Sequence, residues 1–213
     1  MEQLTPVTLP KPGKSPLRFK DLATLSGALR FSRALGGTEE DTVRVQQLAK
    51  NYLADNKSIG DIEIGRVPSG AVYDTLKDRI GVSSADVDVL AHETEHALRL
   101  RGTSNLYRTV LGLSKQVVAL NNMAAVPAIL GLRAMIKNKE ERNSVLRVLA
   151  GASAVAAVPN LVEEGMASTR VVLNSPDKAK AFKRLFPAFA QHAGYGMVAP
   201  GLYLAGTKVE DLL

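Results

Sequence analysis

The sequence predicts a mainly α-helical protein with a small β element before its midpoint. Three observations support this fold class. Capped apolar stripes at helical spacing flank the β element on both sides. Alternating apolar and polar residues, which are typical of half-buried strands, are concentrated within residues 57–82. Two long apolar stretches separated by a polar run follow, and this order predicts an apolar helical hairpin.

We expect one folded domain preceded by an extended arm. The chain has 213 residues, which is long enough for a single substantial core. Four prolines within residues 1–18 favour an extended arm over a helix, and such an arm suits contact with a partner in a larger assembly. The domain, residues 19–213, is expected to contain a helical part (19–56), the strands (57–82) and the remaining helices (83–213).

The composition limits the kinds of site that the chain can build. It contains no cysteine, which excludes disulfides and thiolate metal ligands, so any metal must be held by His, Asp or Glu. A net charge of +6 suits an anionic partner. The basic residues are spread out and form no long run, so we do not expect nucleic-acid binding. The N-terminal segment lacks the apolar core of a signal peptide, which predicts a protein that remains in the compartment where it is made.

Two helices are expected before the strands. Apolar residues share one face over residues 19–36, and two glycines end this helix. Thr38 and Asp41 then have the spacing of a capping box, which predicts a second helix that runs to about Ala54.

The β element is predicted from two adjacent segments. Residues 62–67 alternate between apolar and polar side chains, as in a half-buried strand. Residues 68–82 predict a turn, a short strand around Val72 and Tyr73, a polar tip and a return strand near Ile80.

The helix after the strands carries two of the three histidines of the chain. The segment "SSAD" at 83–86 predicts a capping box, and the helix is expected to run to Arg101 and stop at Gly102. It contains His92 and His96 within "HETEH".

These histidines form an H-E-x-x-H motif. Histidines at i and i+4 project from the same helical face, so both rings can reach one Zn²⁺. Glu93 lies beside this face and is the candidate general base. Glu95, in contrast, is expected to be a solvated helix residue.

The remaining chain predicts a helical hairpin and a mixed C-terminal part. Apolar stretches at 117–136 and 145–162 are separated by a polar run, and their lengths suit either membrane spans or buried core helices. A helix over 160–173 is expected to stop at "NSP". A basic helix is expected at 177–186. An apolar tail that contains Gly and Pro residues and His192 follows it.

A catalytic zinc site requires a third protein ligand, and two carboxylates are candidates. Glu163 and Glu164 lie on the helix predicted at 160–173. Glu164 is preferred because Ala167 and Ser168, three and four residues later, would allow this helix to approach the histidine helix closely. Glu163 is the alternative ligand, or a surface residue favoured by a helix N-terminus.

The segments "AHETEHA" and "EEGMASTR", joined by an apolar hairpin, resemble the bacterial membrane neutral zinc metallopeptidases. More distantly they are similar to the gluzincin-type CAAX-prenyl-protease-like peptidases. The resemblance spans about residues 70–173. It includes Glu164, Arg170 and the "AVYD" stretch with Tyr73. This resemblance implies a zincin-like helical domain.

The resemblance also implies a mechanism. Zn²⁺ would be bound by His92, His96 and Glu164, and Glu93 would act as general base in peptide-bond hydrolysis. The strand near 62–73 would pair with an extended protein or peptide substrate.

Three further residues have expected roles around the metal. Ser168 would hydrogen-bond a histidine ligand, and Arg170 is expected to be a structural partner for a carboxylate. His192 is either an oxyanion donor or a packed core residue.

A non-catalytic protein is the alternative function. It would be a structural or interaction component of a virion or a membrane complex that retains the metallopeptidase scaffold. A membrane location through residues 117–162, or a cytoplasmic one, is compatible with the sequence.

Overall fold

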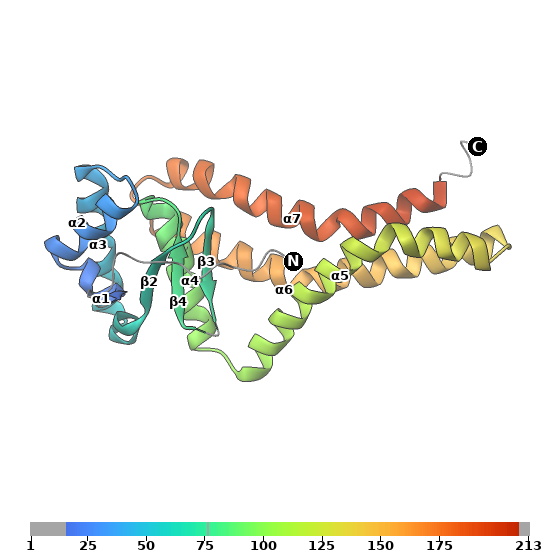
Figure 1. The fold of residues 1–213 in the computed structure, drawn as a ribbon, viewed down its shortest axis with the longest axis horizontal. Helices are drawn as coiled ribbons and strands as arrows, with labels where there is room; N and C mark the ends of the chain where they lie inside the picture. The colour runs from blue at the N-terminus through green and yellow to red at the C-terminus, as the bar shows by residue number, and fades with distance from the viewer. Residues whose placement is uncertain (1–15, 76, 209–213) are drawn as a thin grey trace. The chain divides into compact units, whose positions relative to one another are not determined.

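A computed structural model describes residues 16–75 and 77–208 (Figure 1). It confirms the predicted fold class, because the described residues form mainly helices together with one small sheet. Most of the arm predicted at residues 1–18 lies outside the described residues. The chain forms two compact units, one within residues 1–102 and 169–181 and the other within residues 103–168 and 182–213.

The first unit begins with three helices, α1 (Phe19–Leu22), α2 (Leu25–Ala34) and α3 (Glu39–Asp55). The single helix predicted over residues 19–36 is wrong, because Thr24 is extended and its side chain accepts a hydrogen bond from the Gly27 N–H. Cap formation by this threonine competes with helix continuation. The capping box predicted at Thr38 and Asp41 is confirmed.

The sheet contains β1 (Leu17–Arg18), β2 (Glu63–Arg66), β3 (Ala71–Asp74) and β4 (Arg79–Val82), in the order β1-β2-β4-β3. A short 3₁₀ helix, η1 (Lys57–Asp61), leads from α3 to β2. β2 and β4 are parallel, whereas β3 and β4 form the antiparallel hairpin that the sequence predicts. β2 therefore has a neighbour on each side, and the edge strands of the described sheet are the two-residue β1 and the longer β3.

Helix α4 (Val87–Arg101) follows the sheet and packs against it. Its buried apolar residues, including Leu90 and Ala97, join Ile64 and Ile80 of the strands in one core. The capping box predicted at residues 83–86 is wrong. Asp86 is itself the N-cap and accepts from the Asp88 N–H at 2.9 Å, so the helix begins later than expected. Its predicted end at Gly102 is confirmed.

The second unit is built mainly from three long helices, α5 (Asn105–Met135), α6 (Lys139–Asn174) and α7 (Lys178–Lys208) (Figure 1). The predicted helical hairpin is confirmed as α5 and α6, whose connection is shorter than the predicted polar run. The helix predicted over 160–173 is the C-terminal part of α6.

The C-terminal tail differs from its prediction. It is not irregular but continues the basic helix as α7, with Pro187 and Pro200 inside it. Proline disfavours a helix interior, but Ala199 and Tyr203 are buried in a cluster with Ala125 and Leu146. This packing stabilises the helix around Pro200.

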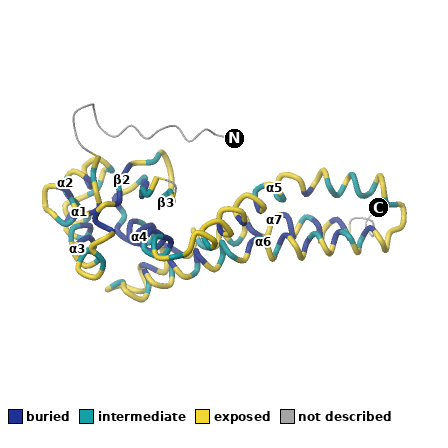
Figure 2. The backbone as a smooth tube through the Cα atoms, turned by 90° about the horizontal axis from the view of Figure 1, so that it is seen from below, coloured by how far each residue is buried: buried dark blue, intermediate teal, exposed yellow. Residues whose placement is uncertain are grey.

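Polar side chains of the second unit make hydrogen bonds between its helices. Asn121 lies 3.2 Å from the Ser153 hydroxyl. Asn122 donates to the Tyr195 carbonyl and accepts from the Ala199 N–H. Many large apolar side chains, in contrast, are exposed, and α5 is mostly exposed along its length (Figure 2). Both α5 and α6 are long and apolar enough to cross a membrane.

Candidate metal centre

The two histidines of α4 are oriented toward each other. The His92 and His96 Nε2 atoms are 3.1 Å apart, and the two rings are nearly perpendicular. Two nitrogens that bind one tetrahedral zinc at its usual distance are separated by about 3.3 Å. The observed separation therefore fits a shared metal ion. It also fits a hydrogen bond between the rings, in which one Nε2 donates and the other accepts.

Glu164 completes the group. One ligand atom each from His92, His96 and Glu164 lies within 4.8 Å of the other two. His96 is 6% exposed and Glu164 is 7% exposed, whereas His92 is partly exposed. Three mutually close N and O donors form a ligand set that could hold a divalent metal ion, and the sequence-based preference for Glu164 agrees with this geometry.

Glu93 occupies the expected place beside the first histidine and is 6% exposed. A carboxylate in a mostly dehydrated position next to a candidate metal ligand suits a proton acceptor. The histidines and Glu93 belong to one rigid helix, so the helix itself fixes their relative positions.

Glu163 has a different role from that of its neighbour. It is 2% exposed and accepts a hydrogen bond from the Tyr107 hydroxyl at 2.8 Å. The prediction that it is a surface residue near a helix N-terminus is wrong, because α6 begins at Lys139 and Glu163 lies deep in its interior. Its carboxylate helps to join α5 to α6 within the second unit.

The structure contradicts the prediction for Glu95. It is not solvated but 4% exposed. The Tyr52 hydroxyl of α3 donates to its Oε1 at 2.8 Å, and Arg170 of α6 lies 3.5 Å from its Oε2. Burial first, then the negative charge of Glu95 and this hydrogen bond, raise the pKa of Tyr52 well above its ordinary value. The phenol therefore remains a proton donor to the carboxylate.

This network confirms that Arg170 is a partner for a carboxylate. It also joins α4 to α3 and to the last turns of α6, three helices of the first unit. Glu164 lies on the same continuous helix as Arg170, less than two turns earlier. Tyr52 was not identified from the sequence, because a lone tyrosine in an amphipathic helix gives no signal of a distant carboxylate partner.

Tyr73 lies in a second polar cluster of the first unit. Its hydroxyl donates to Asp78 at 2.7 Å, and Arg101 at the end of α4 pairs with the same carboxylate. The hydrogen bond from Arg101 is the main reason why the pKa of Asp78 is lowered. Burial and the hydrogen bond to Asp78 raise the pKa of Tyr73. These contacts tie Tyr73 and the tip of the β3–β4 hairpin to α4, and nothing in them indicates a role in metal binding.

Ser168 is partly exposed and lies one helical turn after Glu164. His192 lies on α7 and is exposed, so the prediction of a packed core residue is wrong for it. It lines a cavity of about 410 Å³ within the second unit, and Glu164 lines the same cavity. Lys115 of α5 also lines it and was not identified from the sequence.

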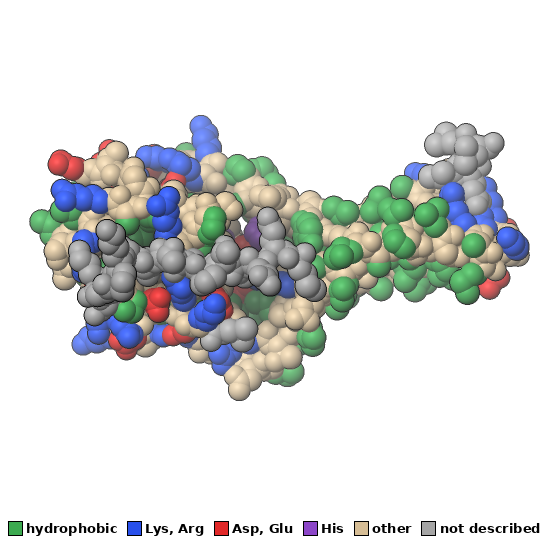
Figure 3. All heavy atoms as spheres, viewed as in Figure 1, with side chains coloured by type: hydrophobic (Ala, Val, Ile, Leu, Met, Phe, Trp, Pro, Cys, Tyr) green, Lys and Arg blue, Asp and Glu red, His purple; other side chains and the backbone are tan. Residues whose placement is uncertain are grey.

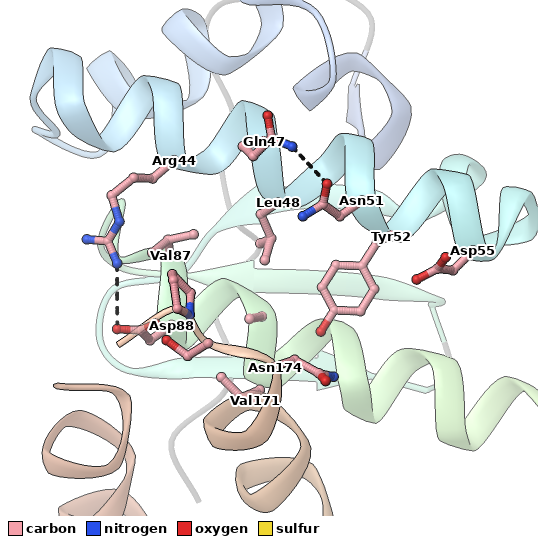
Figure 4. Close-up of a pocket in the computed structure, with 13 residues that line it drawn as sticks. Arg44, Gln47, Leu48, Asn51, Tyr52, Asp55, Val87, Asp88, Val171 and Asn174 are labelled. Carbon is pink, nitrogen blue, oxygen red and sulfur yellow. Dashed lines mark hydrogen bonds and ion pairs between the residues drawn. The ribbon is translucent and has the colours of Figure 1, made fainter. Parts of the chain in front are cut away.

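A second cavity, of about 400 Å³, lies within the first unit between α3, α4 and the end of α6 (Figure 4). Its Arg44 pairs with Asp88 at 3.9 Å, and Gln47 donates to Asn51 at 2.8 Å. Tyr52 lines this cavity, and its hydroxyl donates a hydrogen bond to Glu95. Much of the polar lining is therefore used within the protein.

Comparison of this chain with protein-family models, with curated proteins and with solved structures finds no match. The structure thus defines a mainly helical protein with a candidate His-His-Glu metal centre, and the function is argued from that centre.

Proposed function

We propose that this protein is a zinc-dependent endopeptidase. The observation that carries the proposal is the convergence of His92, His96 and Glu164, with Glu93 on the same helix as the histidines. The sequence resemblance to membrane neutral zinc metallopeptidases points in the same direction.

Zinc is the metal that best matches this donor set. Two imidazole nitrogens and one carboxylate oxygen are typical of a catalytic zinc that keeps a fourth position open. Bound there, zinc would lower the pKa of a water molecule toward neutrality and polarise the carbonyl of the scissile bond.

The residues of the chain supply the proton transfer and the orientation. Glu93 accepts the proton of the attacking water and then delivers it to the leaving amine, as a general base and then a general acid. The Glu95 network positions α4 against α3 and the end of α6. Ser168 is proposed to hydrogen-bond a histidine ligand, which would fix its tautomer.

The sheet offers one position for an extended substrate. The prediction placed this role on the strand near residues 62–73, but β2 lies inside the sheet. The free edge of β3 (Ala71–Asp74) is the part of this segment that could pair with a peptide backbone.

We also propose that α5 and α6 span a membrane. Exposed apolar side chains recur along α5 at Leu106, Val110, Leu113, Val117 and Leu120, a helical stripe suited to lipid. The polar side chains of Asn121 and Asn122 instead pair with other helices. Figure 3 shows apolar side chains gathered over the long helices.

Metal analysis and proteolysis test the enzymatic proposal together. Purified protein is expected to hold about one equivalent of zinc and to cleave an unfolded protein substrate. Glu93→Gln should keep the zinc but lose at least about 100-fold of the activity, because the proton acceptor is removed. Equal cleavage by this variant would contradict the proposal.

The alternative is a non-catalytic component of a larger assembly. The Tyr52–Glu95–Arg170 network is the observation that favours it, because the buried carboxylate of Glu95, inside the motif, pairs with other helices of the protein. One equivalent of zinc with no cleavage of any unfolded substrate would support this alternative.

A further inference from the structure

The cavity beside Glu164 has an asymmetric lining. It is formed by α5, α6 and α7 of the second unit. Lys115 contributes a cation, and Gln191 and His192 contribute hydrogen-bonding groups. Glu164 is the one carboxylate among the described lining residues, and the proposed function assigns it to the metal. The rest of the lining therefore favours an anion.

The polar groups of this lining are available to a ligand. The side chains of Lys115, Gln191 and His192 make no hydrogen bond or ion pair with any other described residue. In the first-unit cavity, in contrast, Arg44 is paired with Asp88. An uncompensated ammonium group beside a cavity is a typical carboxylate-binding feature.

A buried acceptor adds to the polar side of the cavity. Asn160 donates to Ser114 at 2.9 Å, but its Oδ1 is buried without a hydrogen-bond partner. Buried amide oxygens normally have a partner, and a peptide N–H in the cavity would provide one after a small side-chain adjustment.

Another part of the lining is apolar. Val118 and Ala157 are buried there, and Leu161 lies one helical turn from Ala157. A Cβ atom added to Gly196 would lie 3.1 Å from the Ala157 Cβ, so α6 and α7 are in close contact at this point. The apolar part would accept a small or medium apolar side chain better than an aromatic one.

We propose that this cavity binds the C-terminal end of a peptide substrate. Lys115 and His192 hold the terminal carboxylate, and the apolar lining accommodates the last side chain. This inference rests on the proposed peptidase function and deepens it, since Glu164 links the cavity to the metal centre. It assigns the enzyme a preference for bonds near a free, apolar C-terminus.

Binding can be measured apart from catalysis. Dye-labelled peptides ending in valine, either as the free acid or as the carboxamide, are titrated into full-length zinc-loaded Glu93→Gln protein and followed by fluorescence anisotropy. The acid is expected to bind at least about 10-fold more tightly, as for a charge-assisted hydrogen bond. Lys115→Met should abolish this difference.

A matched variant controls for general charge effects. Arg147→Met removes an exposed cation of α6 that does not line the cavity, and it should keep the preference for the acid. His192→Asn provides a second cavity variant and should reduce the preference. Lys115-dependent binding of phosphatidylglycerol vesicles without selectivity for the peptide acid would overturn the proposal in favour of a lipid headgroup.

Cleavage by the wild-type protein separates this inference from the proposed function. If the wild type cleaves peptide acids and amides with equal kcat/KM, the cavity proposal is wrong and the peptidase proposal stands. If it cleaves neither, but the variants show Lys115-dependent binding of the acid, the peptidase proposal fails and the binding site stands.

Discussion

At the scale of single residues, Glu95 is the most informative departure from expectation. It lies between the two histidines in sequence, yet its carboxylate is buried against Tyr52 and Arg170. A buried carboxylate is costly unless it is paired and hydrogen-bonded. The hydrogen bond from Tyr52 to Oε1 and the ion pair between Arg170 and Oε2 offset part of this cost, while Oε2 accepts no hydrogen bond from the described residues.

The Tyr52 hydroxyl should be important for stability. Tyr52→Phe removes the hydrogen bond to Glu95 Oε1 and leaves a buried acceptor unsatisfied, which is expected to cost about 1–3 kcal/mol of unfolding free energy. Chemical denaturation of purified protein measures this loss. Tyr195→Phe removes the hydroxyl of a half-exposed side chain and is the control, with an expected change below about 0.5 kcal/mol. Equal losses of unfolding free energy in the two variants would contradict the stabilising role of the Tyr52 hydroxyl.

The ion pair between Asp78 and Arg101 is expected to be sensitive to acid. The pKa of Asp78 is lower in the folded protein than its ordinary value of 3.8. Its charged form therefore contributes stability above about pH 4, and this contribution is lost as the pH falls through the folded pKa. Asp78→Asn should lower the melting temperature at pH 7 but change it less between pH 5 and pH 3 than in the wild type. Asparagine also tolerates the positive φ of 50° at this position.

At the scale of elements, the long helices combine polar pairs between helices with exposed apolar surface. A protein that folds in water normally buries such side chains. Leu120 and Met123 are 64% and 77% exposed on α5, which is expected for a helix that contacts lipid.

Single cysteines test the membrane proposal without interference, because the chain has none. In membrane vesicles, Leu120→Cys should resist a membrane-impermeant maleimide, since lipid shields the thiol. Lys137→Cys, in the connection between α5 and α6, should be labelled in vesicles of one orientation. Both variants should be labelled after denaturation in detergent. Rapid labelling of Leu120→Cys in intact vesicles of either orientation would show that α5 does not span the membrane.

At the scale of the whole molecule, the candidate centre joins residues far apart in the chain. A ligand that binds only the folded state stabilises it by about 2.7 kcal/mol at 100 times its Kd. Adding zinc at about 100 times its Kd should therefore raise the melting temperature of the metal-free protein.

Variants at two neighbouring positions identify which carboxylate binds the zinc. Glu164→Gln should abolish the stabilisation by zinc, whereas Glu163→Gln should lower the starting melting temperature but retain the zinc-dependent increase. The reverse pattern would transfer the ligand role to Glu163, the alternative predicted from the sequence.

The sequence by itself determined the features that depend on local spacing. Hairpin strands, the α4 motif and the α5–α6 hairpin follow from side-chain periodicity within a few turns. The preference for Glu164 over Glu163 followed from the small residues one turn later. The break at Thr24 and the N-cap at Asp86 were missed because several local caps compete and packing selects among them.

Only the tertiary structure decided the partners that are distant in sequence. It buried Glu95 against Tyr52 and Arg170, it paired Glu163 with Tyr107, and it brought Lys115 and His192 to one cavity. The continuity of α7 through Pro200 was also decided by packing, because burial of Ala199 and Tyr203 outweighed the local preference. Spacing along a chain specifies which face a side chain occupies, but the residue that meets it is set by how the helices pack.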